Sequence, residues 1–171
     1  MKAGPRKKPG ELRRQRRRRP AGCLDHLIAA PLWVAYEANL GTLLRTCDAV
    51  GACMAVPPTP HYRDALRRGD TLSRRPCVHW ADNKLAWIRH QKEAGARVLG
   101  VELADDATHL LELGPAGQLT VVLLGHERSG IPDEAWELLD DVVEIPMIGT
   151  GSSLNVAVAG SLVLYKLAGL S

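Results

Sequence analysis

Short, continuous apolar runs separated by polar turns recur along this chain. Runs of this kind are typical of parallel strands that are covered on both faces. They predict strands at 32–36, 53–56, 77–80, 97–102, 121–124 and 142–145. Segments with apolar residues at helical spacing lie between several of these strands and predict helices at 40–50, 62–69, 84–94 and 154–167. The alternation indicates an α/β domain with a mostly parallel sheet and helices on both faces.

Residues near the helix ends suggest where two of these helices begin and end. Asn39 is placed to cap the 40–50 helix, and Gly51 to end it in a left-handed conformation. Ser153 is the expected cap of the last helix, whose apolar content predicts that it is largely buried. The expected buried stripe of the 40–50 helix is Leu40, Leu43, Leu44, Cys47 and Val50.

Two glycine-containing loops, 125–130 and 146–153, directly follow predicted strands. Loops at the carboxyl ends of parallel strands are where open α/β sheets bind ligands, so a cofactor site is expected there, although ordinary turns would give a similar pattern. A P-loop would need Lys and Ser or Thr directly after Gly130, where Ile131 and Pro132 stand. A dinucleotide fingerprint would need a third glycine where Leu154 stands. Both phosphate-binding motifs are therefore excluded.

Three segments together resemble the motifs of the SpoU/TrmH branch of the SPOUT RNA methyltransferases. They are NLGTLLRTCDAVGA at 39–52, LLGHERSGIP at 123–132 and IPMIGTGSSLNVAVA at 145–159, and the resemblance covers roughly residues 30–168. It implies a C-terminal trefoil knot, S-adenosylmethionine as methyl donor, a homodimer, and methylation of a ribose 2′-hydroxyl in structured RNA. The first segment is most similar to the tRNA guanosine-2′-O branch, which favours tRNA. Ribosomal RNA is the alternative, and a noncatalytic RNA-binding knot protein or a nucleotide-binding switch is a weaker one.

The resemblance also implies roles for single residues. The family assigns proton removal from the hydroxyl to the motif arginine, here Arg45, but a guanidinium with a pKa above about 12 is a poor base. We therefore expect Arg45 to clamp the target phosphate and stabilise developing charge. Ser153 and Asn155 are expected to orient Arg45 and the substrate, Glu127 to fix a loop or the arginine, and Asn39 to act as a cap, a catalytic neighbour or both. The catalytic set is Asn39, Arg45, Glu127, Ser153 and Asn155; the cofactor-binding set is Leu103, Leu124, Gly125, Ile145, Met147 and Leu154.

Charge is unevenly distributed along the chain. Residues 1–20 carry ten Lys or Arg and one Glu, whereas the other 151 residues carry twelve basic and eighteen acidic residues. We expect 1–20 to be a disordered arm that binds RNA phosphates by counterion release, with a solvated tail as the alternative, and 21–171 to be one methyltransferase domain. A second basic group falls between the second and third predicted strands. The expected RNA-binding residues are Arg16, Arg17, Arg18, Arg19, Arg63, Arg67, Arg68, Arg74 and Arg75.

The cysteines, the apolar stretches and the tryptophans indicate no further functional site. The four cysteines, Cys23, Cys47, Cys53 and Cys77, form no CxxC pair. Neither a disulfide framework nor a zinc site is therefore indicated, no metal is expected, and this usage fits a reducing cytoplasm. No signal segment is recognised, and no apolar stretch approaches the length of a membrane span outside the last predicted helix. His126 is expected to be a loop residue. The tryptophans are expected in the core: Trp33, Trp80, Trp87 and Trp136.

Overall fold

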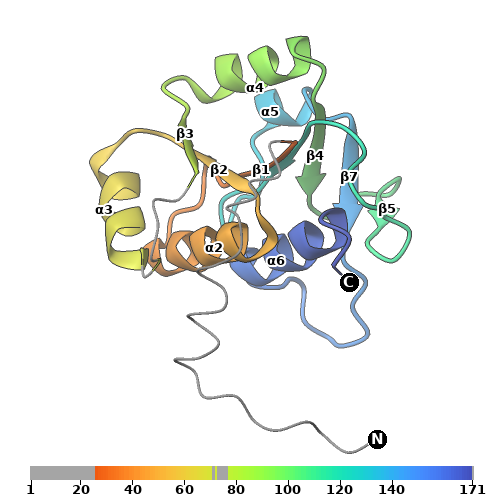
Figure 1. Cartoon of the computed structure of the whole chain (residues 1–171). Coiled ribbons are helices and arrows are strands. Elements are labelled where there is room, and N and C mark those ends of the chain that lie inside the picture. The colour runs from red at the N-terminus through yellow and green to blue at the C-terminus, as the bar shows by residue number, and fades with distance from the viewer. Residues whose placement is uncertain (1–25, 71, 73–76, 171) are drawn as a thin grey trace, which may run out of the picture.

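One parallel sheet organises the protein (Figure 1). The computed structural model describes residues 26–70, 72 and 77–170. In that part, seven strands follow the order β3-β2-β1-β6-β4-β7-β5, and every neighbouring pair is parallel, which confirms the expected α/β class. The strands are β1 (Leu27–Ala30), β2 (Cys53–Val56), β3 (Val78–Trp80), β4 (Arg97–Val101), β5 (Thr108–His109), β6 (Thr120–Leu123) and β7 (Asp141–Glu144).

Helices cover both faces of this sheet. Figure 1 shows α2 (Glu37–Val50) and α6 (Val156–Leu167) side by side on one face, and α4 (Lys84–Glu93) and α5 (Asp133–Trp136) on the other. Two apolar cores correspond to these layers: one contains Leu43, Val122 and Leu164, and the other contains Ile88, Val98 and Ala135. No helix of the described residues is long and apolar enough to cross a bilayer.

The first strand lies earlier in the chain than the pattern predicted. The strand expected at 32–36 is wrong, because β1 is Leu27–Ala30 and pairs on both sides, with β2 and β6. Pro31 follows it and has no N–H to donate to either neighbour, so the ladder stops at Ala30. Leu32 and Val34 are nevertheless buried, and their burial explains why the segment has the composition of a strand.

Two predicted helix caps are also wrong. Helix α2 begins at Glu37, which places Asn39 inside its first turn instead of at its cap. Helix α6 is capped by Asn155, whose Oδ1 accepts hydrogen bonds from the N–H groups of Ala157 and Val158 at 2.9 and 3.3 Å. The predicted C-terminal end of α2 is confirmed, because Gly51 adopts φ 80°. The predicted buried stripe of α2 is confirmed at all of its positions: Leu40, Leu43, Leu44, Cys47 and Val50.

Helix α3 (Pro60–Gly69) packs directly on the backbone of α2. A Cβ added to Gly69 would lie 2.4 Å from the Cα of Gly41, and a Cβ added to Gly41 would lie 3.0 Å from the Cα of Gly69. Only glycine permits so close an approach of two helices at this crossing. The contact fixes where α3 lies relative to the start of α2.

The last helix is buried on one side only, so the expectation of a largely buried helix is wrong. Ala157, Gly160 and Leu164 face the core, whereas Val158, Leu162 and Tyr165 remain 48, 42 and 39% exposed. These three recur at helical spacing and form an apolar stripe on the outer surface of α6. Two tryptophans expected in the core are also exposed, Trp80 at 42% and Trp136 at 38%.

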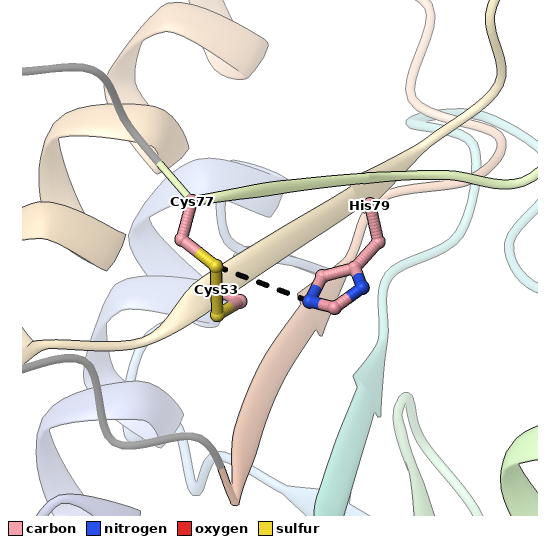
Figure 2. A group of neighbouring side chains, drawn as sticks. All are labelled: Cys53, Cys77 and His79. Carbon is pink, nitrogen blue, oxygen red and sulfur yellow. Dashed lines mark hydrogen bonds between the residues drawn. A yellow bond between two sulfur atoms is a disulfide. The ribbon is translucent and has the colours of Figure 1, made fainter.

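A disulfide joins Cys53 of β2 to Cys77, the residue before β3 (Figure 2). The spacing of the cysteines indicated no disulfide framework and did not predict this bond. Met54 lies opposite Val78 in the parallel register, so the preceding cysteines are opposite each other with a Cα–Cα distance of 4.8 Å. His79 points toward the pair, with its Nε2 3.9 Å from the Cys77 sulfur (Figure 2). Bonded sulfurs are not the thiolates that metals require, and the bond removes the support that cysteine spacing gave for a reducing compartment.

Candidate active site

A cleft of about 510 Å³ opens beyond the carboxyl ends of β4, β6 and β7, next to the start of α2 and α6. This is the edge at which open parallel sheets bind ligands. Sequence analysis placed ten residues in this region that do line the cleft. They are Leu103, Leu124, Gly125, Ile145, Met147 and Leu154 from the expected cofactor set, and Asn39, Glu127, Ser153 and Asn155 from the expected catalytic set.

A chain of side-chain hydrogen bonds links three distant segments at the cleft. The Nδ2 of Asn155 donates to Oδ1 of Asn39 at 3.0 Å, and the Nδ2 of Asn39 donates to Oε1 of Glu127 at 2.7 Å. Because Asn155 also caps α6, the network runs from the N-terminus of α6, through α2, to the loop after β6. Each of the three sequence motifs contributes one member.

Glu127 anchors this network to the backbone. Its Oε2 accepts from the N–H of Ala35 at 2.9 Å, and its Oε1 accepts from the N–H of Tyr36 at 3.1 Å. Partial burial alone would favour the neutral acid, but the hydrogen bonds from Ala35, Asn39 and Tyr36 outweigh it and lower the pKa of Glu127. The carboxylate is therefore ionised at neutral pH, directly before the positive end of the α2 dipole.

The glycine-rich loop after β6 closes on itself. His126 and Gly130 exchange two backbone hydrogen bonds of 2.9 and 2.8 Å. A Cβ added to Gly125 would lie 2.3 Å from the carbonyl carbon of Gly130, so this glycine is required by the returning loop. The geometry of the loop is thus enough to require glycine here, whether or not Gly125 also contacts the expected cofactor.

Glu102, directly after β4, supports the same loop. Its Oε1 accepts from the N–H of Ile131 at 3.1 Å and would lie 2.6 Å from a Cβ added to Gly130, whose φ is 70°. Burial raises the pKa of Glu102, although the hydrogen bond from Ile131 opposes the shift. Sequence reasoning missed Glu102 and Tyr36 as cleft residues. Their positions immediately after a strand and before a motif helix were the available signals.

Arg45 does not line the cleft of its own chain. Its Nη1 donates to the carbonyl of Gly69 at 3.2 Å and its Nη2 to the hydroxyl of Thr42 at 3.3 Å, so the guanidinium lies on the outer surface between α2 and α3. The contacts expected from Ser153 and Asn155 to Arg45 do not occur within the described part of this chain; Asn155 contacts Asn39 instead. Arg45 is exposed and is not among the buried residues of α2, in agreement with the predicted stripe, which did not include it.

The described members of the second basic group all lie on α3. The Nε of Arg63 donates to the carbonyl of Pro58, and its guanidinium lies 4.6 Å from the ring centroid of Trp80. Arg67 pairs with Asp64, and Arg68 forms an ion pair with Glu37 at the start of α2. All three arginines are exposed. The other predicted RNA-binding residues, Arg16 to Arg19, Arg74 and Arg75, lie outside the described residues, as does Cys23.

Comparison with known proteins identifies the family to which this α/β chain belongs. Residues 32–165 match the profile of the SpoU rRNA Methylase family, and the chain belongs to this family. It is 36% identical over 136 residues to the tRNA (guanosine(18)-2′-O)-methyltransferase of Thermus thermophilus, a match that covers 75% of this chain and 66% of that enzyme.

Two solved structures are also similar. The TrmH/SpoU tRNA modifying enzyme of A. aeolicus superposes with a TM-score of 0.75 at 25% identity, covering 94% of this chain and 83% of that one. The AdoMet-bound rRNA methyltransferase of Sinorhizobium meliloti superposes with a TM-score of 0.70 at 26% identity, covering 85% and 57%. The chain thus spans slightly less than two thirds of the Thermus enzyme and little more than half of the Sinorhizobium one.

Proposed function

We propose that this protein transfers a methyl group from S-adenosylmethionine to a ribose 2′-hydroxyl of structured RNA, with tRNA as the favoured substrate. The observation that carries the proposal is the hydrogen-bonded chain Asn155–Asn39–Glu127 at the mouth of the cleft. It joins all three motif segments at one point. A binding protein without catalysis has no evident need for this arrangement, because each residue would serve its own element separately.

The cleft suits the proposed methyl donor. Its volume is typical of cofactor sites, and Leu124, Ile145 and Leu154 supply apolar surface on which an adenosine could lie. No lysine of the described residues lines it, which disfavours a nucleoside triphosphate, and the ionised Glu127 makes the surroundings favourable for a cationic sulfonium. S-adenosylmethionine brings its own leaving group, so the protein supplies binding, orientation and control of the hydroxyl proton.

The residues of this chain divide those tasks. Asn39 is 8% exposed, and Glu127 and Asn155 hold both ends of its amide, so it presents a fixed polar surface to the cleft. Ser153 is an exposed hydroxyl on the same wall and can contact the ribose. Arg45 clamps a substrate phosphate beside the reacting hydroxyl and stabilises developing negative charge.

A homodimer completes this picture. The apolar stripe Val158, Leu162 and Tyr165 on α6 would be covered by a second copy. Arg45 lies on the outer surface of the neighbouring helix α2, outside the cleft of its own chain. Dimerisation through α2 and α6 would let the guanidinium of one copy approach the cleft of the other copy. We further infer that the C-terminal segment is threaded through a loop to form the trefoil knot that the resemblance of the three motifs implies.

The RNA substrate follows from the relatives and the charge pattern. The similarity to the Thermus tRNA enzyme favours tRNA, while the similarity to an rRNA methyltransferase keeps ribosomal RNA as the second candidate. The exposed arginines of α3 and the basic arm at 1–20 would hold RNA through its phosphates, leaving residues 21–171 as the methyltransferase domain.

The proposal is tested by incubating the protein with labelled S-adenosylmethionine and unfractionated tRNA or ribosomal RNA, then mapping the label by nucleotide. Label on a tRNA ribose is expected. Label confined to ribosomal RNA would show that ribosomal RNA is the substrate in place of tRNA. Label on a base would overturn the proposal of 2′-O-methylation.

Calorimetry with S-adenosylhomocysteine, against ATP, GTP and NAD as controls, tests the cofactor separately. A Leu154→Glu variant is expected to weaken the binding of S-adenosylhomocysteine, because it places a charge in the apolar wall.

A further inference from the structure

A second cavity, of about 440 Å³, adjoins the cleft. His126 and Gly130 line both, so the closed loop after β6 is the wall between them. The other side of the cavity is formed by Trp33, His61 and Lys84. These residues follow β1, β2 and β3 respectively, so the cavity continues the carboxyl edge of the same sheet.

The walls of this cavity combine aromatic surface with positive charge. The ammonium of Lys84 lies 5.4 Å from the ring centroid of Trp33. The imidazole of His61 meets the ring of Tyr62 edge-on, with centroids 5.1 Å apart. No carboxylate of the described residues lines the cavity. Its chemistry therefore suits a flat, polar, π-rich group that carries negative charge nearby.

Part of this cavity is held rigidly. The hydroxyl of Tyr62 donates to the carbonyl of Leu32 at 2.9 Å, which ties α3 to the segment that carries Trp33. Burial, together with the negative charge of Glu127, raises the pKa of Tyr62 to about 12, so this donor persists at all physiological pH values. Burial also lowers the pKa of Lys84, as expected for an ammonium partly withdrawn from water.

We propose that this cavity binds an unstacked nucleotide of the RNA substrate, with its base on Trp33 and a phosphate at Lys84. The inference rests on the proposed function, because the same RNA strand must present its ribose to the adjoining cleft. A base can compete with the ammonium for the indole, since base–aromatic stacking is at least comparable in strength with a half-buried cation–π contact. The flexible lysine stem then carries the charge to the phosphate.

The position of the cavity makes it a site for the substrate and not for the cofactor. It is separated from the cleft by the thickness of one loop, and the cleft is the site proposed above for S-adenosylmethionine. Sequence analysis assigned Trp33 to the core and did not use Lys84. Both become RNA contacts under this proposal, at positions outside the three motifs.

The test compares Trp33→Leu and Lys84→Ala with matched controls, Trp136→Leu on α5 and Arg89→Ala on the same helix as Lys84. Affinity for unfractionated tRNA is measured as a function of salt, together with quenching of tryptophan emission and calorimetry with S-adenosylhomocysteine. Trp33→Leu is expected to weaken tRNA binding about 5- to 100-fold and to remove part of the quenching. Lys84→Ala is expected to reduce the slope of log K against log salt by about 0.7 to 0.9. Cofactor binding stays unchanged in both.

The two proposals fail in different ways. If wild type methylates RNA and both cavity variants bind and methylate tRNA like their controls, the nucleotide site is wrong and the proposed function holds. If wild type binds tRNA without methylating it, the function is wrong, and the site is still decided by whether Trp33→Leu loses affinity and quenching. Lys84→Ala covers the case in which Trp33→Leu fails to fold, because Lys84 is outside both apolar cores.

Discussion

At the scale of single residues, Glu127 does more than its position in a loop suggests. One carboxylate accepts from two backbone N–H groups and one side-chain amide, all of them about 90 residues away in sequence. Loss of this acceptor would destabilise the fold, because its three donors would be left without a hydrogen-bond partner near the cleft. Glu127 is therefore expected to affect stability as well as activity.

Glu127→Gln is expected to lower the free energy of unfolding at neutral pH. The carboxylate has two acceptor oxygens and the amide has only one. The NH2 group of the glutamine would therefore face at least one of the N–H donors that now bind Glu127. Because the folded pKa of Glu127 lies below its ordinary value of 4.5, its contribution is complete above that value and is lost as pH falls through the lower folded pKa. Urea denaturation of both proteins between about pH 7 and pH 3 measures this. A stability difference that does not shrink in acid would contradict the assignment.

Arg45→Ala is expected to reduce methyl transfer at least about a hundredfold, the scale for removing a charge-stabilising group. Folding and cofactor affinity should change little, because the exposed side chain donates only to Gly69 and Thr42 among the described residues. Single-turnover rates and calorimetry provide the measurements. Arg45→Lys should restore little activity, since a point charge does not copy a bidentate fork. An alanine variant within threefold of wild type would remove Arg45 from the mechanism.

At the scale of elements, pairing decides features that no local pattern contains. Cys53 and Cys77 are 24 residues apart and meet because β2 and β3 are in parallel register. In the same way Gly41 and Gly69 meet at the crossing of α2 and α3. Both contacts join neighbouring elements whose placement is fixed by long-range packing.

Cys77→Ser is expected to lower the free energy of unfolding by about 3.5 kcal/mol in the absence of reductant, the chain-entropy value for cysteines 24 residues apart. Cys77 is exposed, so the serine should cause no packing loss of its own. Urea midpoints with and without dithiothreitol provide the comparison, in which wild type with reductant should match the variant. A wild-type midpoint that is insensitive to reductant would show that the bond contributes nothing to stability.

At the scale of the whole molecule, the outer face of α6 predicts association. Leu162→Lys is expected to convert a homodimer into monomers, because it places a charge in the centre of the apolar stripe. Leu111→Lys serves as the control, since Leu111 is 76% exposed and lies outside that helix. Sedimentation equilibrium gives the mass of each protein. A wild-type monomer, or a dimer that persists in the Leu162 variant, would exclude this interface.

Deleting residues 1–20 is expected to weaken RNA binding and to flatten its salt dependence. Loss of even four phosphate contacts would change the slope of log K against log salt by about three to four. The rest of the chain is net acidic, which increases the relative contribution of the arm. Cofactor affinity and the methylated position should stay the same, because Lys and Arg contacts to phosphates position RNA without reading its sequence. An unchanged slope would leave the α3 arginines as the main RNA contacts.

The α/β class and most of the strands and helices could be predicted from the residue pattern, and the resemblance of three motifs to a known family predicted ten of the residues that line the cleft. These depend on local period and on short motifs, both of which a single chain displays directly. The pattern misplaced the first strand because the buried Leu32 and Val34 imitate a strand. It misplaced the cap of α2 because that helix begins after Tyr36 without a side-chain cap, and the cap of α6 because Ser153 and Asn155 are both suitable caps.

The contacts between those residues could not be predicted and appear only in the folded chain. The Asn155–Asn39–Glu127 chain, the disulfide at Cys53 and the hydrogen bond from Arg45 to Gly69 each join residues distant in sequence. Which partner a side chain meets depends on strand order, register and helix crossing, and these are set by packing the whole core at once. The exposed stripe of α6 has the same origin, because a uniformly apolar helix does not itself show which side the sheet will cover.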